Sequence, residues 1–538
     1  MAKATMKRCI FILCILFFAF GLCAAQTTYN LENIYQRGIP DTSLRYWGNR
    51  LAGVGDVNGD GFDDVAISAY TRNTWKPKIY LYFGSAAGLD TIYDLLIEPP
   101  VESTMGSIAG GDINKDGYSD IILGLEGSTK KIWVYYGGPT VDTIPDITFS
   151  NSGKILECQV ATGDLNGDDT TDIIVGDYWG DDNNGLDGHV YIFKGSAQFD
   201  TLPWLEIKGR NDEELGSTVG SGGDVNNDGY QDLYAGAPGN NAAYTWAGRL
   251  YIFYGGVAMD TIPDFIKNGE GASQFWGEYS SALCPAENEY GRFWTGNNCY
   301  PGGYMTTKQN GKAELFYGGI VMDTVPDMTI TGADSFTNLG VTFASALIDS
   351  GFNGDLICGA AEPTGIGMGR CWTSKLAQDT IVDGWLQGRW VGDQIGVNTA
   401  NAGDVNGDGR EEIMFGSYTD TNRLVVVCKY TGPDGIEGKT DSLGQNIVLK
   451  LSQNFPNPFK QSTAIDYQIS EKRLVNLSVY NIAGQKVKTL INEIINPGFY
   501  RVKWDGRDDK GQKVAGGVYF YRFTSDKKYT VKKMVVLH

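Results

Sequence analysis

A short acidic pattern recurs five times along the sequence and constrains the fold more than any other feature. The copies occupy residues 56–64, 112–120, 164–172, 224–232 and 404–412. Each copy carries oxygen-bearing side chains at its first, third, fifth and ninth positions, and a run of β-forming apolar residues follows it. Turn-like loops repeated between β-type segments predict an all-β repeat protein.

The spacing of these oxygen atoms predicts that each loop binds Ca²⁺. A hard cation of this size takes carboxylate, amide and backbone oxygens, and the four side-chain positions supply them. Gly at position six allows the sharp turn, and Asp169, which tolerates the left-handed region, replaces it in the third copy. The loop has nine residues and β-type flanks, so it is not an EF-hand. Metal-free Asn/Asp/Gly turns are the alternative, but five copies with one ligand spacing favour calcium.

Each repeat contains signals for four short strands. The strand after the loop ends in small residues, as at 235–238 and 358–361. A third strand of alternating β-formers ends in Gly and recurs at 78–84, 131–137, 189–195, 249–255 and 312–318. A turn such as Asp-Thr-Ile-Pro-Asp then leads to a fourth strand. Four strands at a period of about 60 residues are typical of propeller blades.

The count of repeats predicts a seven-bladed ring. A hydrophobic residue followed by Gly marks the start of most units, and the starts lie at 48, 106, near 158, 216, 277, 340 and 396. Units five and six have lost the metal loop, at 286–290 and 349–355. Residues 38–44 resemble the fourth strands, whereas unit seven ends with its third strand at 423–428. We therefore expect the N-terminal segment to complete blade seven, which removes free sheet edges.

These features resemble the FG-GAP repeats of the integrin α-chain propeller over about residues 30–432. In that family the calcium loop joins the first two strands of a blade, and its metal is structural. The resemblance implies about five structural Ca²⁺ sites. Their side-chain ligands would be Asp56, Asn58, Asp60, Asp64, Asp112, Asn114, Asp116, Asp120, Asp164, Asn166, Asp168, Asp172, Asp224, Asn226, Asp228, Asp232, Asp404, Asn406, Asp408 and Glu412. Backbone carbonyls would come from Phe62, Tyr118, Thr170, Tyr230 and Arg410.

Residues 1–25 predict a secretory signal. Lys7 and Arg8 precede an apolar stretch at 9–20 and a small-residue cleavage site at 23–25. A membrane anchor is the alternative, but the apolar stretch is short for a membrane span. We therefore expect a secreted or outer-membrane surface protein, exported through the periplasm, with no transmembrane helix in the mature chain.

Six cysteines remain after that signal. In an oxidising compartment the pairs Cys284–Cys299 and Cys358–Cys371 are candidate local disulfides. Cys158 and Cys428 are expected to be buried thiols. No Cys/His zinc spacing occurs, and the sequence contains only 2 histidines.

The charge is distributed unevenly. Of the formal net charge of -20, residues 1–25 contribute +3 and residues 449–538 contribute +9, so residues 26–448 carry -32. Such an acidic body argues against nucleic-acid binding.

A different domain follows the repeats. Residues 433–448 lack periodicity and are expected to be a linker between the propeller, 26–432, and the segment 449–538. Strand-like runs at 463–469, 474–480, 500–504, 518–523 and 532–537 alternate with turns, and they predict a small Ig-like β-sandwich.

The motifs of this segment closely resemble the C-terminal sorting domain of the bacterial type IX (Por) secretion system. They are the opening Gln-Asn-Phe-Pro-Asn-Pro-Phe at 453–459, the turn at 479–484, the acidic turn at 504–509, the strand at 517–521 and the Lys-Lys-Met-Val-Val end. The resemblance implies that residues 449–538 engage the type IX secretion machinery, and that the mature protein is released or attached to surface lipopolysaccharide.

Alternating connections place the loops between second and third strands on the face opposite the acidic loops. Several of these loops are long and rich in aromatic residues with Asn and Asp, at 177–184, 239–246 and 297–304. Such residues suit a sugar ring or a protein partner, although surface loops also carry them for packing. The candidate ligand-binding residues are Trp179, Tyr244, Trp246, Tyr300 and Tyr304.

Catalytic motifs are absent from the sequence: it has no Gly-x-Ser-x-Gly elbow, metalloprotease helix or phosphate loop. Carboxylates that could cleave or eliminate glycosides are Asp181, Asp182, Asp187, Glu278 and Glu287. We therefore expect a calcium-binding adhesion or binding module for a glycan or protein ligand. A carbohydrate-active lyase or hydrolase and a structural surface component are the alternatives, because fold does not determine function.

Overall fold

The computed structural model describes residues 28–537, with gaps at 30, 39, 41–42, 100–102, 128–130, 151–158, 181–185, 279–280, 285–289, 298–310, 320–321, 332–338, 349–354, 361–367, 373–383, 388–394, 418–423, 432–448, 452–453, 455–458, 461, 470–472, 483, 496–497 and 526–527. Within these residues the regular elements are β-strands. None of the described segments is a helix long and apolar enough to cross a membrane.

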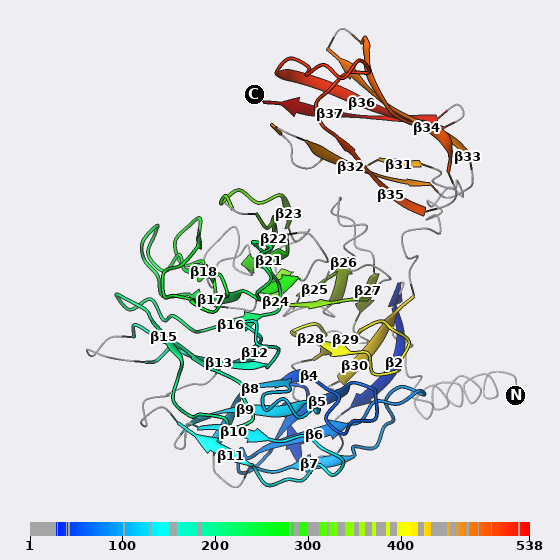
Figure 1. Cartoon of the computed structure of the whole chain (residues 1–538). Helices are drawn as coiled ribbons and strands as arrows, with labels where there is room; N and C mark the ends of the chain where they lie inside the picture. The colour runs from blue at the N-terminus through cyan, green and yellow to red at the C-terminus, as the bar shows by residue number, and fades with distance from the viewer. Residues whose placement is uncertain are drawn as a thin grey trace, which may run out of the picture.

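Seven antiparallel sheets follow one another along the chain and form the blades of a propeller (Figure 1). Blade one contains β4 (Leu51–Gly55), β5 (Asp64–Thr71), β6 (Pro77–Tyr82) and β7 (Leu95–Ile97). Blade two contains β8 (Ser103–Gly111), β9 (Asp120–Gly127), β10 (Lys131–Tyr135) and β11 (Ile147–Phe149). Blade three contains β12 (Gln159–Gly163), β13 (Asp172–Asp177), β14 (His189–Phe193) and β15 (Leu205–Lys208).

The remaining blades repeat this order. Blade four contains β16 (Val219–Ser221), β17 (Leu233–Ala237), β18 (Arg249–Phe253) and β19 (Phe265–Asn268). Blade five contains β20 (Ala282–Cys284), β21 (Arg292–Asn297), β22 (Lys312–Tyr317) and β23 (Met328–Thr331). Blade six contains β24 (Leu339–Ala346), β25 (Asp355–Ala360), β26 (Met368–Trp372) and β27 (Gly384–Gln387). Blade seven contains β28 (Asn398–Gly403), β29 (Glu412–Gly416), β30 (Leu424–Tyr430) and β2 (Leu31–Gly38).

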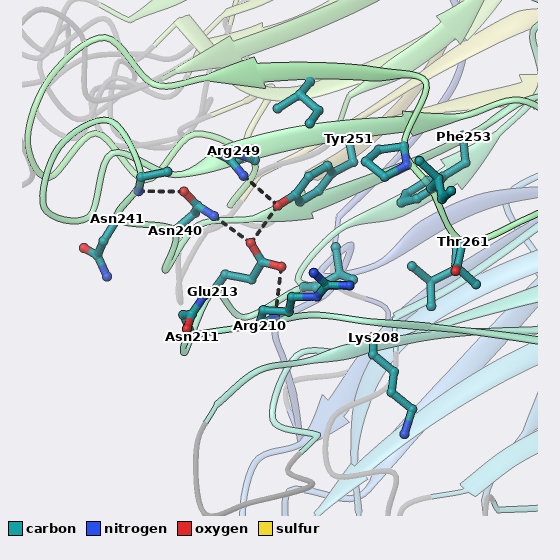
Figure 2. Close-up of a pocket in the computed structure, with 16 residues that line it drawn as sticks. Lys208, Arg210, Asn211, Glu213, Asn240, Asn241, Arg249, Tyr251, Phe253 and Thr261 are labelled. Carbon is teal, nitrogen blue, oxygen red and sulfur yellow. Dashed lines mark hydrogen bonds between the residues drawn. The ribbon is translucent and has the colours of Figure 1, made fainter.

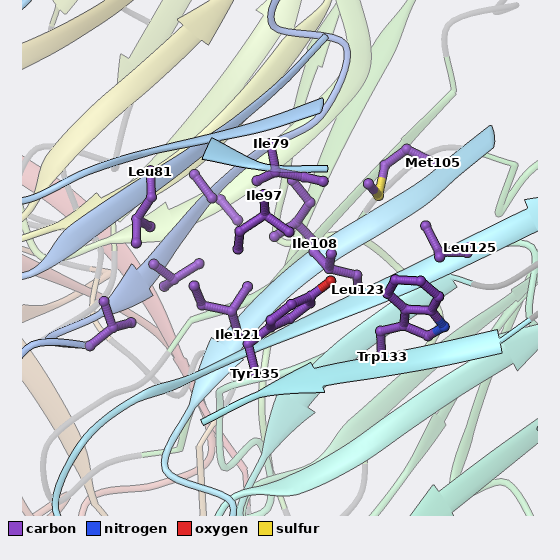
Figure 3. Close-up of a cluster of buried hydrophobic side chains, with 14 of the residues drawn as sticks. Ile79, Leu81, Ile97, Met105, Ile108, Ile121, Leu123, Leu125, Trp133 and Tyr135 are labelled. Carbon is purple, nitrogen blue, oxygen red and sulfur yellow. The ribbon is translucent and has the colours of Figure 1, made fainter. Parts of the chain in front are cut away.

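The blades close into a ring. The first strand of each blade lies against the first strand of the next, and β28 of blade seven returns to β4 of blade one. A separate apolar core fills each of the seven interfaces between neighbouring blades. Figure 3 shows the core between blades one and two, where Leu81 and Ile97 face Ile121 and Tyr135. The seven-bladed all-β fold predicted from the repeats is confirmed.

The position of a strand within its blade explains its composition. Second strands are covered on both faces by neighbouring blades, so β5 and β13 are buried along almost their whole length and are mostly apolar between their polar ends. First strands converge near the ring axis and contain small residues. A Cβ atom added at Gly110 of β8 would lie 2.3 Å from the carbonyl oxygen of Val54 in β4, so only Gly fits there.

The ring closes through the N-terminal segment, but not through the residues that we predicted. Strand β2 pairs antiparallel with β30, from Leu31 opposite Tyr430 to Gly38 opposite Leu424. Figure 1 shows this blue strand beside the yellow strands of blade seven. The predicted segment, 38–44, is wrong, because Tyr35 and Leu31 are the residues that fill the apolar cores beside blade seven.

Two further edge strands were not predicted. Strand β3 (Leu44–Arg45) pairs with the end of β5, and β1 (Thr28–Tyr29) pairs with β27 on the outer edge of blade six. The replaced loops of units five and six and the linker at 433–448 lie wholly or largely outside the described residues.

The C-terminal segment forms a two-sheet β-sandwich, as predicted. One sheet contains β31 (Leu449–Leu451), β32 (Thr463–Ile469) and β35 (Gly498–Trp504). The other contains β34 (Lys486–Ile495), β33 (Arg473–Asn481), β36 (Gly517–Ser525) and β37 (Lys528–Val536). Trp504, Tyr521 and Phe523 lie in the core between the sheets. The sequence analysis missed β31 and β34.

Replacing Tyr35 by Ala tests the closure of the ring by β2. Tyr35 is buried between blades seven and one, and truncating a buried aromatic side chain costs about 3 to 5 kcal/mol of unfolding free energy. Chemical denaturation of the protein measures the change. The matched control is Glu32→Ala on the exposed side of the same strand, which should change stability by less than about 0.5 kcal/mol. Equal stabilities of the two variants would contradict the assigned strand.

Candidate functional site

All five acidic loops lie where the sequence predicted them, in the hairpin between the first and second strands of a blade. They connect β4 to β5, β8 to β9, β12 to β13, β16 to β17 and β28 to β29. Because the strands of each blade are antiparallel, these loops share one face of the ring with the turns between third and fourth strands. The connections between second and third strands lie on the opposite face.

Within the first loop, side-chain oxygens turn inward and bind the loop's own backbone. The Asp56 carboxylate accepts hydrogen bonds from the N–H groups of positions four, five and six at 2.7, 3.1 and 2.8 Å. Asn58 Oδ1 accepts from the Asp60 N–H at 2.8 Å, and Asp56 Oδ1 accepts from the same group. The oxygens of positions one and three therefore meet at one side of the loop.

Three other loops repeat this arrangement, and one departs from it. The loops at 112–120, 224–232 and 404–412 each direct the oxygens of positions one and three to the N–H of position five. In the third loop the Asn166 amide instead donates to both carboxylate oxygens of Asp172, at 3.1 Å each. Asn406 also donates to Glu412 while its oxygen accepts from Asp408.

The carboxylate at position nine is buried and ties the hairpin to the third strand. Asp64 Oδ2 accepts from the Val57 N–H and Oδ1 from the Gly84 N–H, both at 2.9 Å. Asp120, Asp172 and Asp232 make the corresponding pairs of bonds. This carboxylate therefore has a structural role that does not require metal.

Burial in turn disfavours the charged form of this group. It raises the pKa of Asp64, Asp120 and Asp232 to about 7, that of Asp172 to about 6 and that of Glu412 to about 8. Backbone N–H donors oppose the rise, and the neighbouring carboxylates of the same loop add to it. A cation in the loop would reverse the balance, because positive charge favours the carboxylate form.

The loops also connect neighbouring blades. The carbonyl of Asp56 accepts from the Ser119 N–H in the next blade at 2.9 Å, and that of Val57 accepts from the Gly138 N–H at 2.8 Å. Equivalent bonds join loop two to blade three, loop four to blade five and loop five to blade one. The Tyr118 ring covers Gly59, where an added Cβ would lie 2.3 Å from the ring. Each of the five acidic loops is therefore hydrogen-bonded to the blade that follows it.

The donor set of the loops fits a calcium ion. Each carboxylate has about four lone-pair positions and uses only part of them for backbone N–H groups, so oxygens from positions one, three, five and nine stay available to a cation. In the part of the chain that the structure describes, no three His, Cys, Asp or Glu side chains already surround a metal-sized position. The loops are preformed by their backbone bonds.

The opposite face carries exposed aromatic side chains, three of which the sequence singled out. Trp179 is 43%, Tyr244 54% and Trp246 40% exposed. Trp246 packs against Phe275 with ring centroids 5.6 Å apart. Tyr300 and Tyr304 lie outside the described residues.

Sequence reasoning missed a fourth aromatic residue on that face. Trp75 lies in the connection between β5 and β6, is 48% exposed, and stacks on Tyr46 with ring centroids 5.5 Å apart. The Arg45 guanidinium covers the Trp75 ring at 2.7 Å from its centroid. Trp75 could have been predicted from the sequence, because its loop connects second and third strands as the loop of Trp179 does.

A pocket of about 620 Å³ lies between blades three and four (Figure 2). Its polar side centres on Glu213, which accepts hydrogen bonds from the Arg210 N–H at 3.0 Å, the Asn240 amide at 2.6 Å and the Tyr251 hydroxyl at 2.7 Å. Burial, followed by the hydrogen bond to Glu213, raises the pKa of Tyr251 to about 12. This pocket was not predicted, because its residues come from three separate connections.

The carboxylates considered for catalysis do not form a described site. Asp181, Asp182 and Glu287 lie outside the described residues. Asp187 Oδ1 accepts from the Asp212 N–H at 2.9 Å, which fixes the connection from β15 to β16. Glu278 is half-buried beside the start of blade five.

The prediction of a buried Cys428 thiol is confirmed, and its sulfhydryl donates to Asn33 Oδ1 at 3.2 Å. Cys284 and Cys358 are buried in the core between blades five and six. Cys158, Cys299 and the side chain of Cys371 lie outside the description, so the two disulfides stay predictions.

The fold and its loops define a propeller of the FG-GAP type. Residues 47–82 and 215–253 match the FG-GAP repeat, and residues 112–175 match the FG-GAP-like repeat. The chain therefore contains FG-GAP repeats, as the sequence analysis inferred. The C-terminal match, at 459–528, is to the FlgD Ig-like domain.

Integrin α chains are similar to the repeat region. The chain is 27% identical to integrin alpha pat-2 of Caenorhabditis elegans over 245 residues, which are 40% of this chain and 20% of the relative. It is 23% identical to integrin alpha-5 of Xenopus laevis over 259 residues, covering 44% of this chain and 24% of that one. It is 31% identical to integrin alpha-3 of Mus musculus over 149 residues, 26% and 14% of the two chains. The chain thus spans a quarter or less of these relatives.

The raised pKa of the position-nine carboxylates predicts how stability depends on pH without metal. A carboxyl whose folded pKa exceeds its unfolded value of about 4 binds more protons when folded, so stability falls as pH rises from about 4 to about 7. In chelator, the melting temperature should fall between pH 5 and pH 8. In Asp120→Asn, one such group no longer titrates and the slope should be shallower. A slope that steepens, or a melting temperature that rises over this range, would contradict the assignment.

Proposed function

We propose that this protein is a secreted, calcium-stabilised propeller that acts as a binding or adhesion module for a glycan or protein ligand at the cell surface. The observation that carries the proposal is the set of exposed aromatic residues, Trp75, Trp179, Tyr244 and Trp246, on a rigid ring whose opposite face holds the acidic loops. Large aromatic side chains in loops on a fixed scaffold suit recognition. The similarity to integrin α chains supports an adhesive role.

Calcium would bind in the five acidic loops through the side chains of positions one, three, five and nine and the carbonyl of position seven. The backbone bonds around Asp56 and Asn58 hold two of these ligands together before metal arrives. The ion would offset part of the charge of -32 carried by residues 26–448. Its role would be structural, since each loop also joins two blades.

Two loop variants separate metal binding from the hairpin bonds. Asp116→Ala removes an exposed ligand whose bonds to the Tyr118 N–H and the Asn114 amide are also exposed, so it should lower the melting temperature much more in calcium than in chelator. Asp120→Ala also removes the bonds to Ile113 and Gly137, so it should lower the melting temperature in chelator as well. For the unchanged protein, calcium should raise the melting temperature, because a ligand bound only to the native state stabilises it. Indifference of the unchanged protein to chelator would refute the calcium sites.

The ligand prediction concerns the aromatic face. The protein in calcium is screened against glycans and extracellular proteins, with turnover measured in the same wells. Trp179→Ala with Trp246→Ala should weaken the bound ligand about tenfold, or about 1.4 kcal/mol. The control is Ile144→Ala, a more exposed apolar residue in a turn on the acidic face, which should have no effect. Loss of binding in the control alone, release of product, or no binding at all would count against the proposal.

The C-terminal sandwich is proposed to direct export. Its motifs resemble the type IX sorting domain, and its charge of +9 contrasts with the acidic repeats. The protein would cross the outer membrane through the type IX machinery and reach the cell surface or the medium.

Removing residues 449–538 tests this role in a type IX-competent host. The truncated protein should accumulate in the periplasm, whereas the full chain should be found outside the outer membrane. Cell fractionation with immunodetection measures the distribution. Export of the truncated protein at the level of the full chain would exclude the sorting role.

A further inference from the structure

The pocket between blades three and four is a groove along the side of their interface. It is lined by β15 and its connection to β16, by the start of the loop from β17 to β18, and by the turn from β18 to β19. One wall is apolar, and consists of Ile207, Leu215, Ile262, Pro263 and Ile266. The groove therefore combines an apolar wall with a polar one.

The polar wall is held in place by a chain of hydrogen bonds. Arg249 donates to Asn268 Oδ1 at 2.7 Å and to the Tyr251 hydroxyl at 3.1 Å. The Tyr251 hydroxyl donates to Glu213, which also accepts from Asn240. Glu213 and Asn240 are 6% and 7% exposed, so this network is buried and fixed. The residues do not have to rearrange to receive a ligand, which reduces the entropic cost of binding.

One of the three cations that line the groove has no partner for its charged group among the described residues. Glu213 is joined to Arg249 through the Tyr251 hydroxyl, and Lys208 Nζ lies 3.5 Å from Glu206. The guanidinium of Arg210 makes no hydrogen bond or ion pair with the residues that the structure describes, although the Arg210 backbone N–H binds Glu213. Figure 2 shows its side chain between the Glu213 network and Thr261.

This arrangement specifies the ligand's chemistry. A guanidinium pairs a carboxylate through two parallel hydrogen bonds. The Asn211 amide and the Thr261 hydroxyl also line the groove, and they suit the hydroxyl groups of a sugar. The apolar wall suits the apolar face of a sugar ring. Because the repeat region carries -32 overall, acidic polymers are repelled elsewhere, and the single unpaired Arg210 makes this groove the place where one carboxylate is favoured.

We propose that this groove binds a carboxylated sugar of an acidic glycan, with Arg210 pairing the carboxylate. The inference deepens the proposed function, since it names the ligand class of a glycan-binding module. Specificity for the acidic sugar would then lie in the groove between blades three and four, and not in the exposed aromatic residues alone. An acidic peptide would satisfy Arg210 but would not need the Asn211 amide and the Thr261 hydroxyl.

The test measures binding of tetragalacturonate to the protein in calcium by calorimetry. The carboxyl-reduced tetrasaccharide is the neutral probe and a tetraglutamate peptide the protein-like probe. The variants are Arg210→Gln, Arg210→Lys and the matched control Lys76→Gln, which removes one exposed positive charge from a loop of blade one. Arg210→Gln removes no described side-chain contact, so folding should be unaffected, and melting in calcium checks this.

We expect the acidic sugar to bind at least tenfold more tightly than the neutral sugar and the peptide. Arg210→Gln should weaken it at least tenfold, Arg210→Lys should retain part of the affinity, and Lys76→Gln should bind as the unchanged protein does. Equal binding of acidic and neutral sugars, tighter binding of the peptide, or no effect of Arg210→Gln would overturn the inference. If another ligand binds and is lost only in the Trp179 and Trp246 variants, the inference fails while the proposed function stands; absence of any ligand overturns both.

Discussion

The buried carboxylate at the ninth position of each acidic loop is the contact on which the ring depends. In blade one, Asp64 binds the N–H of Val57 at the start of the loop and that of Gly84 at the end of the third strand. It thus fixes three of the four strands of a blade at one end. The loop that it holds then presents the carbonyls of Asp56 and Val57 to the next blade. The contacts that fix the hairpin within a blade therefore also position the groups that join it to the next blade.

This coupling explains why the acidic loops are the most regular part of the sequence. A carboxylate suits position nine because it accepts two donors while buried: two backbone N–H groups in the first four loops, and the Val405 N–H with the Asn406 amide at Glu412. Its burial is costly for the charged form, as the raised pKa of Asp64 and Asp120 indicates. A cation at the loop would remove much of that cost. In the proposed calcium-bound protein, the same loops would join neighbouring blades and hold the metal, and each role would support the other.

The repeats made the architecture predictable. Each acidic loop indicates the hairpin between the first and second strands of a blade, and each strand that ends in Gly indicates the third strand. The closing strand was misplaced for a physical reason. Residues 38–44 share a turn motif with the fourth strands, and this motif led to the wrong prediction. Strand β2 instead occupies the position because Leu31 and Tyr35 pack into the cores on either side of blade seven. No local sequence motif indicates that packing. The groove at Arg210 escaped prediction for a similar reason, since three connections far apart in sequence meet there.

We propose that the five loops are metal sites within one ring, and the most direct test is the calcium stoichiometry of the folded protein. Native mass spectrometry or equilibrium dialysis of protein first stripped with chelator and then returned to calcium counts the ions. We expect about five ions per chain, one for each loop that keeps ligands at positions one, three, five and nine. A folded protein that takes up none would show that the loops are hydrogen-bonded turns alone.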